Sequence, residues 1–192
     1  GGKVLPPEVE PHAQTIRQVI KKLPKNVVSY LVTHLYDVED ILTLSDYIGS
    51  GGIQVSEDVG VEAMKTLRSH TSKKIIKTVV VDAATARWKL LEYEPYCDFI
   101  LLDSRVGGYV GGTGAANDWE LCGALIQAAA KPVYVAGGLT PENLLEAMQK
   151  THPFGVDVST GVSTYADAYL RKDRKDPEKI KKFIEIARNF TS

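Results

Sequence analysis

The residues with the clearest chemical potential lie in the stretch from Asp103 to Trp119. Asp103 follows residues 99–102, an apolar run that predicts a buried parallel strand. Five glycines then precede Asp118, and so many glycines favour a lid over a ligand rather than rigid packing. Barrels of alternating strands and helices place their chemistry at the carboxyl ends of strands. From these residues alone, Asp103 is either a proton-transfer group or the cap of a turn.

Two more glycine-containing loops each follow an expected strand near the end of the chain. One contains Gly137 and Gly138, and the other contains Ser159, Thr160 and Gly161. Glycines let backbone N–H groups approach an anion closely, and hydroxyls add further donors. Two such loops after consecutive final strands form the usual phosphate site of a β/α barrel. Together they favour a phosphorylated ligand over tight turning alone.

Strand-like and helical segments alternate along the chain, and this positions the three loops. The expected strands are residues 27–32, 52–55, 74–81, 99–102, 132–136 and 154–158. The expected helices are residues 8–23, a helix capped by Asp37, 59–69, 85–93, 118–130, a helix capped by Thr140 with Pro141 in its first turn, and a helix after Asp176. The alternation predicts an α/β fold with a parallel sheet and right-handed crossovers. No linker interrupts it, so we expect a single domain over residues 1–192.

The composition argues against several classes of protein. The net charge is −1, so the chain offers no basic face for nucleic acid. No apolar run approaches the roughly 18 residues of a membrane span, and no secretory signal is recognisable. The two cysteines form no disulfide framework, which fits a reducing cytoplasm, and no Cys/His cluster has metal-ligand spacing.

Four motifs, in order, resemble the phosphoribosylanthranilate isomerase family of tryptophan biosynthesis. They are residues 101–104 (Leu-Leu-Asp-Ser), 111–119 (Gly-Gly-Thr-Gly to Asp-Trp), 136–143 (Ala-Gly-Gly-Leu-Thr-Pro-Glu-Asn) and 156–162 (Val-Asp-Val-Ser-Thr-Gly-Val), with Lys175 and Asp176 before the last helix. The match extends from about Gly1 to the C-terminus. It implies a TIM (βα)8 barrel. It also implies an Amadori rearrangement of N-(5'-phosphoribosyl)anthranilate to 1-(2-carboxyphenylamino)-1-deoxyribulose 5-phosphate, which needs no cofactor.

The resemblance also implies roles for single residues. Asp103 matches the family's general acid, which protonates the furanose ring oxygen. Asp157 would lie beneath the ligand, and Lys3 aligns with an arginine that pairs with the anthranilate carboxylate. The phosphate-binding residues would be Gly137, Gly138, Ser159, Thr160 and Gly161, and the lid would contain Gly111, Gly112, Thr113 and Gly114. The implied partner is a small phosphorylated substrate, without nucleic acid or membrane, and the expected state is a monomer or homodimer.

The sequence departs from the family at the general base. The family uses a cysteine in a Lys-Ile-Cys-Gly strand, which does not occur in this sequence. Cys97 would lie at the wrong end of a strand and Cys122 inside a helix, so both are expected to be packing residues. Either the chain lacks the first strand, first helix and second strand of the barrel, or a diverged enzyme uses another base, with His34 or Asp82 as candidates. Other family positions are changed at Ser56, Asn117 and Ser163.

Three functions therefore stay open at this stage. The first is an isomerase of the phosphoribosylanthranilate type. The second is a phosphate-binding barrel without turnover, which the missing cysteine favours. The third is an isomerase of another sugar phosphate, since phosphate loops do not specify the rest of a substrate.

Overall fold

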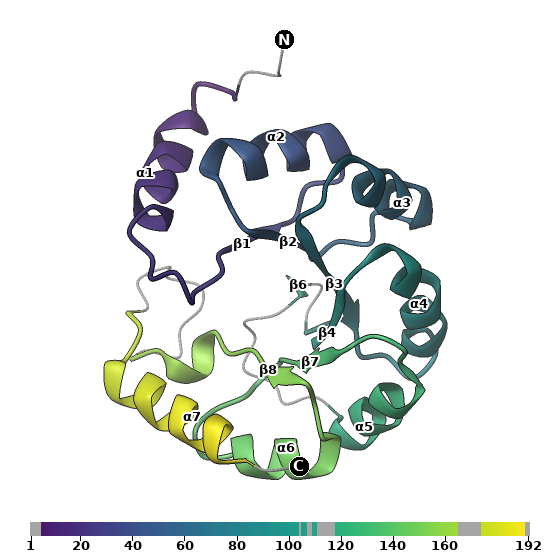
Figure 1. Cartoon of the computed structure of the whole chain (residues 1–192). Helices are drawn as coiled ribbons and strands as arrows, with labels where there is room; N and C mark the ends of the chain where they lie inside the picture. Colours follow the sequence, from purple (N-terminus) through teal and green to yellow (C-terminus); the bar gives the residue numbers. More distant parts are fainter. Residues whose placement is uncertain (1–4, 104, 107–108, 111–117, 165–173, 191–192) are drawn as a thin grey trace. The chain divides into compact units, whose positions relative to one another are not determined.

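The computed structural model describes residues 5–103, 105–106, 109–110, 118–164 and 174–190 (Figure 1). The chain divides into two compact units. Unit 1 comprises Gly1–Thr78 with Pro95–Asp98, and unit 2 comprises Val79–Glu94 with Phe99–Ser192. The expected single domain over residues 1–192 stays a prediction.

Unit 1 alternates helices with parallel strands. Its elements are α1 (Glu10–Ile20), β1 (Tyr30–Thr33), α2 (Val38–Ile48), β2 (Gly52–Val55), α3 (Val61–His70) and β3 (Lys74–Val80), the last two residues of which belong to unit 2. β1 pairs with β2 and β2 pairs with β3, both in parallel. Ile53, Val55 and Ile75 on these strands are fully buried. The expected alternation is thus confirmed within unit 1.

Helix α2 shows how local chemistry fixes an element. The Asp37 carboxylate accepts a hydrogen bond from the Asp40 N–H at 2.9 Å, which satisfies a donor that the first helical turn leaves unpaired. At the other end Gly49 takes a left-handed conformation with φ of 74° and closes the helix. The expected cap at Asp37 is confirmed.

Unit 2 contains the remaining elements. In chain order they are α4 (Ala86–Tyr93), the 3-10 turn η1 (Glu94–Tyr96, which continues into unit 1), β4 (Phe99–Asp103), β5 (Arg105–Val106), β6 (Tyr109–Val110), α5 (Trp119–Ala128), β7 (Val133–Val135), α6 (Leu144–Thr151), β8 (Gly155–Val156), the 3-10 turn η2 (Thr160–Val162) and α7 (Pro177–Asn189). β4 pairs with β7 and β7 with β8, again in parallel. β5 and β6 form an antiparallel hairpin that the glycine-rich sequence did not predict.

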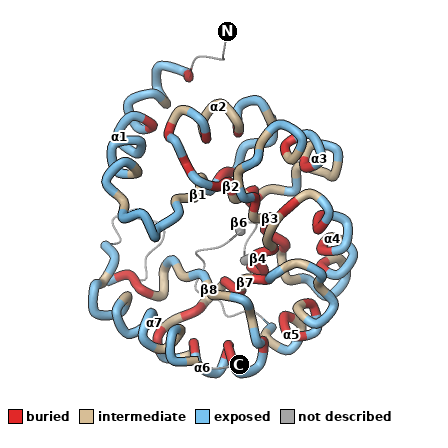
Figure 2. Tube along the Cα trace, viewed as in Figure 1, coloured by how far each residue is buried: buried red, intermediate tan, exposed pale blue. Residues whose placement is uncertain are grey.

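The core of unit 2 lies between the strands and the helices that follow them. Val135, Leu144 and Phe183 belong to one buried cluster, which joins β7, α6 and α7. Figure 1 shows α5, α6 and α7 on one side of β4, β7 and β8. Figure 2 shows the buried residues concentrated on the strands and the exposed residues on the outer helix faces. The three strands are therefore fixed by a packed core against these helices.

Several expected boundaries were wrong, among them the starts of β1 and α6 and the ends of α1 and β8, and for α6 the cause is clear. Helix α6 begins at Leu144, three residues after Thr140 and Pro141 were expected to start it. The Asn143 side chain closes a turn there: its Oδ1 accepts from the Thr140 N–H at 2.8 Å, and its Nδ2 donates to the Gly138 carbonyl at 2.9 Å. Strand β8 is also shorter than expected, although the Asp157 N–H still donates to the Val135 carbonyl at 2.9 Å.

Candidate active site

Asp103 is the last residue of β4 and is 8% exposed. The strand is held on both sides at this point. The Asp103 carbonyl accepts from the Val81 N–H at 2.9 Å, and the Leu102 carbonyl accepts from the Ala136 N–H at 2.8 Å. The backbone that carries this buried carboxyl group is thus fixed at the carboxyl end of a parallel strand, where β/α barrels place their chemistry.

The strand register relates Asp103 to Asp157. Leu102 aligns with Val135, and Val135 aligns with Val156. Asp103 and Asp157 are each one residue beyond this row, so their side chains leave the same face, about 10 Å apart at the backbone across two strand spacings. This spacing leaves room for a small ligand between two carboxyl groups.

The two aspartates differ in exposure: Asp103 is buried, whereas solvent reaches Asp157. Protein atoms nevertheless surround part of the Asp157 carboxyl group, and this partial burial raises its pKa above the ordinary value. The structure thus places Asp157 directly after β8, where the sequence predicted a residue beneath the ligand.

The first predicted phosphate loop follows β7 and has a conformation that requires glycine. Gly137 and Gly138 have φ values of 84° and 65°, a region that other residues rarely adopt. The Asn143 amide holds this loop by donating to the Gly138 carbonyl. A bond to this carbonyl orients the whole peptide group, including the N–H of Leu139. The loop is therefore a rigid turn with a fixed backbone.

The second predicted phosphate loop packs directly on the first. Ser159 follows β8, and Thr160 and Gly161 form most of η2. A Cβ atom added to Gly161 would overlap the Leu139 carbonyl oxygen of the first loop. Only glycine permits this close approach of two backbones. The five residues predicted to bind phosphate therefore lie on two loops in direct contact.

Two lysines from outside both loops hold the second one. Lys175 Nζ donates to the Ser159 carbonyl at 2.9 Å and to Ser163 Oγ at 3.0 Å. Lys179 Nζ donates to the Ser163 carbonyl at 2.9 Å. From the sequence, Lys175 was noted only as part of a family motif, and Lys179 was assigned no role. Each lysine contacts a residue 16 positions away, and no local pattern reveals such a contact.

The cysteines have the predicted packing role. Cys97 and Cys122 are free and buried, with exposed fractions of 3% and 0%. Burial, and then the nearby Asp118 charge, raise the pKa of the Cys122 thiol to about 12. A thiol with so high a pKa is not a thiolate at neutral pH and does not act as a base.

The two other candidate bases have partners of their own. In unit 1, His34 Nδ1 lies 2.8 Å from a carboxylate oxygen of Glu57, and the Tyr36 hydroxyl donates to the other oxygen at 3.1 Å. In unit 2, Asp82 caps a turn by accepting from Thr85 Oγ1 at 2.7 Å and the Ala84 N–H at 3.0 Å. These bonds lower the pKa of Asp82, which makes it a weaker base.

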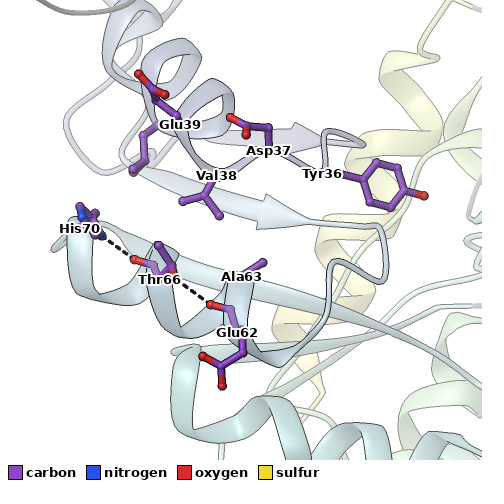
Figure 3. Close-up of a pocket in the computed structure, with 9 residues that line it drawn as sticks. Tyr36, Asp37, Val38, Glu39, Glu62, Ala63, Thr66 and His70 are labelled. Atoms are coloured by element: carbon purple, nitrogen blue, oxygen red, sulfur yellow. Dashed lines mark hydrogen bonds between the residues drawn. The ribbon is translucent and has the colours of Figure 1, made fainter.

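A groove of about 520 Å³ lies between α2 and α3 of unit 1 (Figure 3). Val38 and Ala63 line its apolar part. Along α3, Thr66 Oγ1 donates to the Glu62 carbonyl and His70 Nδ1 donates to the Thr66 carbonyl, each at 2.8 Å. These bonds serve the helix itself, and none of the described site residues lines the groove. We therefore do not assign the groove to the active site.

Several predicted residues lie outside the described part of the chain. They are Lys3 and the lid residues Gly111, Gly112, Thr113 and Gly114. Within the described residues, no three His, Cys, Asp or Glu side chains group as metal ligands, and no helix is long and apolar enough to cross a membrane.

The chain matches a sequence family over most of its length. The family model described as N-(5'phosphoribosyl)anthranilate (PRA) isomerase matches residues 7–186. The N-(5'-phosphoribosyl)anthranilate isomerase of Desulforudis audaxviator is 36% identical over 176 residues, which cover 91% of this chain and 79% of that protein. These figures place the match well beyond a shared motif.

Solved structures agree with the sequence match. Phosphoribosyl anthranilate isomerase from Thermotoga maritima has a TM-score of 0.78 and 28% identity, covering 93% of this chain and 81% of that chain. A second phosphoribosyl anthranilate isomerase structure, in complex with reduced 1-(o-carboxyphenylamino)-1-deoxyribulose 5-phosphate, has a TM-score of 0.74 and 26% identity, covering 93% and 80%. The α/β barrel class expected from the sequence is confirmed by these neighbours.

Proposed function

This chain belongs to the N-(5'-phosphoribosyl)anthranilate isomerase family of tryptophan biosynthesis, and we propose that its unit 2 supplies the acid and the phosphate site of that reaction. The observation that carries the proposal is the shared row of Asp103 and Asp157 beside two loops whose backbones touch. An acid at one strand end and an anion site after the next two strands match an aminoaldose phosphate.

Asp103 is the general acid of the proposed mechanism. Its carboxyl proton goes to the furanose ring oxygen of the substrate, the bond from C1' to that oxygen breaks, and a protonated Schiff base forms. Loss of the C2' proton to a base then gives an enolamine, which tautomerises to the aminoketose product. No atom or electron is gained overall, so the reaction needs no redox partner or cofactor. A positioned acid of this kind contributes a factor of about 100 to 10,000 in rate.

Gly137, Gly138, Ser159, Thr160 and Gly161 bind the substrate phosphate in this proposal. Left-handed glycines and a close backbone contact support it, since both arrangements bring N–H groups near an anion. In this proposal Asp157 lies beneath the ligand, where a carboxyl group with a raised pKa can hydrogen-bond a sugar hydroxyl. Lys3 would pair with the anthranilate carboxylate, and residues 111–114 would form the lid.

The partners and location follow from the same family. We infer a small phosphorylated substrate, no nucleic-acid or membrane partner, and a monomeric or homodimeric state. The two free, buried cysteines support a reducing compartment, the cytoplasm.

A second candidate function is a barrel that binds the phosphorylated ligand without turning it over. The burial of both cysteines favours it, because neither thiol can replace the family's basic cysteine. The two candidates share the phosphate site and differ in catalysis alone.

One experiment separates them. The loss of anthranilate-type fluorescence is followed when the full chain meets freshly made N-(5'-phosphoribosyl)anthranilate. We expect turnover in the wild type and a loss of at least about a hundredfold in Asp103→Asn, with the ligand affinity nearly unchanged. Asp37→Asn is the matched control, because asparagine keeps the exposed helix cap at that position.

Unchanged turnover in Asp103→Asn would remove Asp103 from the mechanism. A wild type that binds reduced 1-(o-carboxyphenylamino)-1-deoxyribulose 5-phosphate but shows no turnover would establish the second candidate instead.

A further inference from the structure

We propose that Lys175 is a positioning residue of the phosphate site: it orients the Ser159–Thr160 peptide so that the Thr160 N–H faces the ligand. This inference rests on the proposed phosphate-binding role of the second loop. It assigns a function to a lysine that does not need to touch the substrate.

The chain around Lys175 runs antiparallel to the second loop. Ser163 and Lys175 form an isolated antiparallel bridge. The Thr164 N–H donates to the Arg174 carbonyl at 2.9 Å, and the Asp176 N–H donates to the Val162 carbonyl at 2.8 Å. Lys175 thus starts from a backbone position fixed on both sides, directly beside the loop that it holds.

From this position the Lys175 ammonium group bonds two parts of the loop. It donates to the Ser159 carbonyl at 2.9 Å and to the Ser163 hydroxyl at 3.0 Å. Ser163 is 2% exposed, so one end of this bridge is anchored in the interior. The lysine therefore joins the beginning of the loop to its buried end.

The bond to Ser159 determines where the next N–H group faces. The Ser159 carbonyl and the Thr160 N–H belong to one peptide group, and the chain has no cis peptide among its described residues. In a trans peptide the C=O and N–H bonds face opposite ways. The Ser159 carbonyl faces Lys175, so the Thr160 N–H faces away from it.

The charge of the lysine also strengthens that donor. A hydrogen bond from a cation to the carbonyl polarises the peptide group and makes its N–H a stronger donor. Lys175 and Lys179 moreover place two positive charges on the carbonyls around this loop. A phosphate dianion is attracted by both charges without contacting either lysine.

The first loop is held in the same manner by a neutral group. The Asn143 amide donates to the Gly138 carbonyl at 2.9 Å, and this carbonyl shares a peptide with the Leu139 N–H. One loop is therefore oriented by an amide and the other by a cation. The cation is the group whose removal should weaken anion binding more than it weakens the fold.

The test compares three single variants with the wild type. Lys175→Met removes the charge and both bonds, and Lys175→Arg keeps a charged donor. Lys182→Met is the matched control, since it removes the same charge from α7. Lys182 is exposed there, and its ammonium group bonds the Glu142 carboxylate at 3.1 Å rather than a loop carbonyl. Binding is measured by titration with reduced 1-(o-carboxyphenylamino)-1-deoxyribulose 5-phosphate and with inorganic phosphate, and kcat and KM are measured separately.

We expect Lys175→Met to raise the Kd for both probes, and the KM, at least about tenfold, which is the scale of a lost charge-assisted hydrogen bond. The kcat at saturation should change less than about threefold. Lys175→Arg should recover part of the affinity, and Lys182→Met should match the wild type.

Equal Kd values in Lys175→Met and Lys182→Met would overturn the inference and leave the proposed function standing. A loss of affinity in Lys175→Met that is proportional to the fraction of unfolded protein, and that Lys175→Arg does not restore, would also overturn the inference. Such a result would mean that Lys175 only stabilises the fold. A wild type without turnover would count against the proposed function alone if it still binds inorganic phosphate and Lys175→Met does not. A wild type that binds neither probe would overturn both.

Discussion

The two ends of the strands carry aspartates whose pKa values are shifted in opposite directions. At the amino end, in unit 1, Asp98 accepts from the Ile75 N–H at 2.8 Å, from Arg68 at 2.9 Å and from Lys74 at 2.9 Å. Burial alone would raise the pKa of Asp98, but the bonds from Ile75 and Lys74 and the charges of Lys74 and Arg68 bring that pKa below the ordinary value. At the carboxyl end, in unit 2, burial raises the pKa of Asp157.

The difference separates a stabilising end from the end to which we assign the proposed reaction. An aspartate with three donors is satisfied in its charged form and contributes to folding. An aspartate with a raised pKa costs free energy when charged, and such groups cluster at functional sites. The amino ends of β4, β7 and β8 also serve stability: Phe99, Tyr134 and Phe154 form an aromatic cluster there, with ring centroids 5.4 to 5.8 Å apart. The amino ends of the strands are therefore built from packing and satisfied charges.

The largest effect that would sharpen this comparison comes from two glycines of unit 2. Gly161→Ala at the carboxyl end drives a Cβ into the Leu139 carbonyl, so a backbone must move. We expect a loss of about 3 kcal/mol in the free energy of unfolding and at least a roughly hundredfold weaker affinity for inorganic phosphate. Gly155→Ala at the amino end meets only the Tyr134 ring, which can turn, and should cost about 1 kcal/mol. Equal phosphate affinity in the two variants would contradict a phosphate site on the second loop.

Asp98→Ala should have the next largest effect, on stability alone. Asp98 and Arg68 are only 22% and 28% exposed, so the removal leaves a partly buried guanidinium and the Ile75 N–H without this carboxylate. We expect the free energy of unfolding to fall by about 2 kcal/mol in urea denaturation, with turnover per folded molecule unchanged. Glu62→Ala, which removes an 86% exposed carboxylate from an ion pair with the 60% exposed Lys65, is the control and should cost less than about 0.5 kcal/mol.

The pH dependence of stability should differ in sign between the two aspartates. Asp98 has a lowered folded pKa, so its contribution is present above the unfolded pKa and is lost as pH falls through the folded pKa. Asp157 has a raised folded pKa, so the folded state binds its proton more tightly and stability falls as pH rises from the unfolded value of 3.8 through the folded pKa.

Asp157→Asn should therefore be at least as stable as the wild type at pH 7, and this advantage should vanish in acid below pH 3.8, where both forms are uncharged. Thermal unfolding across this pH range measures it. A variant that is less stable than the wild type at pH 7 would place Asp157 with the stabilising aspartates and break the comparison.

The smallest effect is expected at His34 of unit 1. Its side chain is 60% exposed, and an exposed pair with Glu57 contributes less than about 1 kcal/mol to folding. We expect His34→Asn to leave the free energy of unfolding within that range and turnover within about threefold. A hundredfold loss of turnover would instead make His34 a proton-transfer group of the reaction.

Local signals explain why much of the fold could be predicted from the sequence. Asp37, Asp118 and Asp176 cap their helices because each acts within three residues of itself. The alternation of apolar strand-like runs with helical segments predicted the parallel strands that each unit shows. The start of α6 was wrong because Asn143 closes a turn onto Gly138, a competition that the Thr-Pro pattern does not reveal.

The candidate site could be predicted from the sequence only where its residues belong to a recognisable local pattern. Asp103 and the glycines were found from strand ends and glycine content, and their places on β4 and on two touching loops support the predicted phosphate site. The part played by Lys175 depends on a contact to Ser159, 16 residues away, and no local pattern encodes such a contact. The opposite pKa shifts of Asp98 and Asp157 depend in the same way on neighbours that folding supplies.

The bond between the Thr164 N–H and the Arg174 carbonyl has a practical consequence for engineering. The Thr164 nitrogen and the Arg174 carbonyl oxygen are 2.9 Å apart, so the two residues that flank the connection before α7 are held side by side. The entropy of closing a loop grows only slowly with its length, by about 0.6 kcal/mol for each doubling. A peptide tag or a small domain with adjacent termini, inserted between Thr164 and Arg174, should therefore be carried at little cost in stability, with the anchor of the second loop intact.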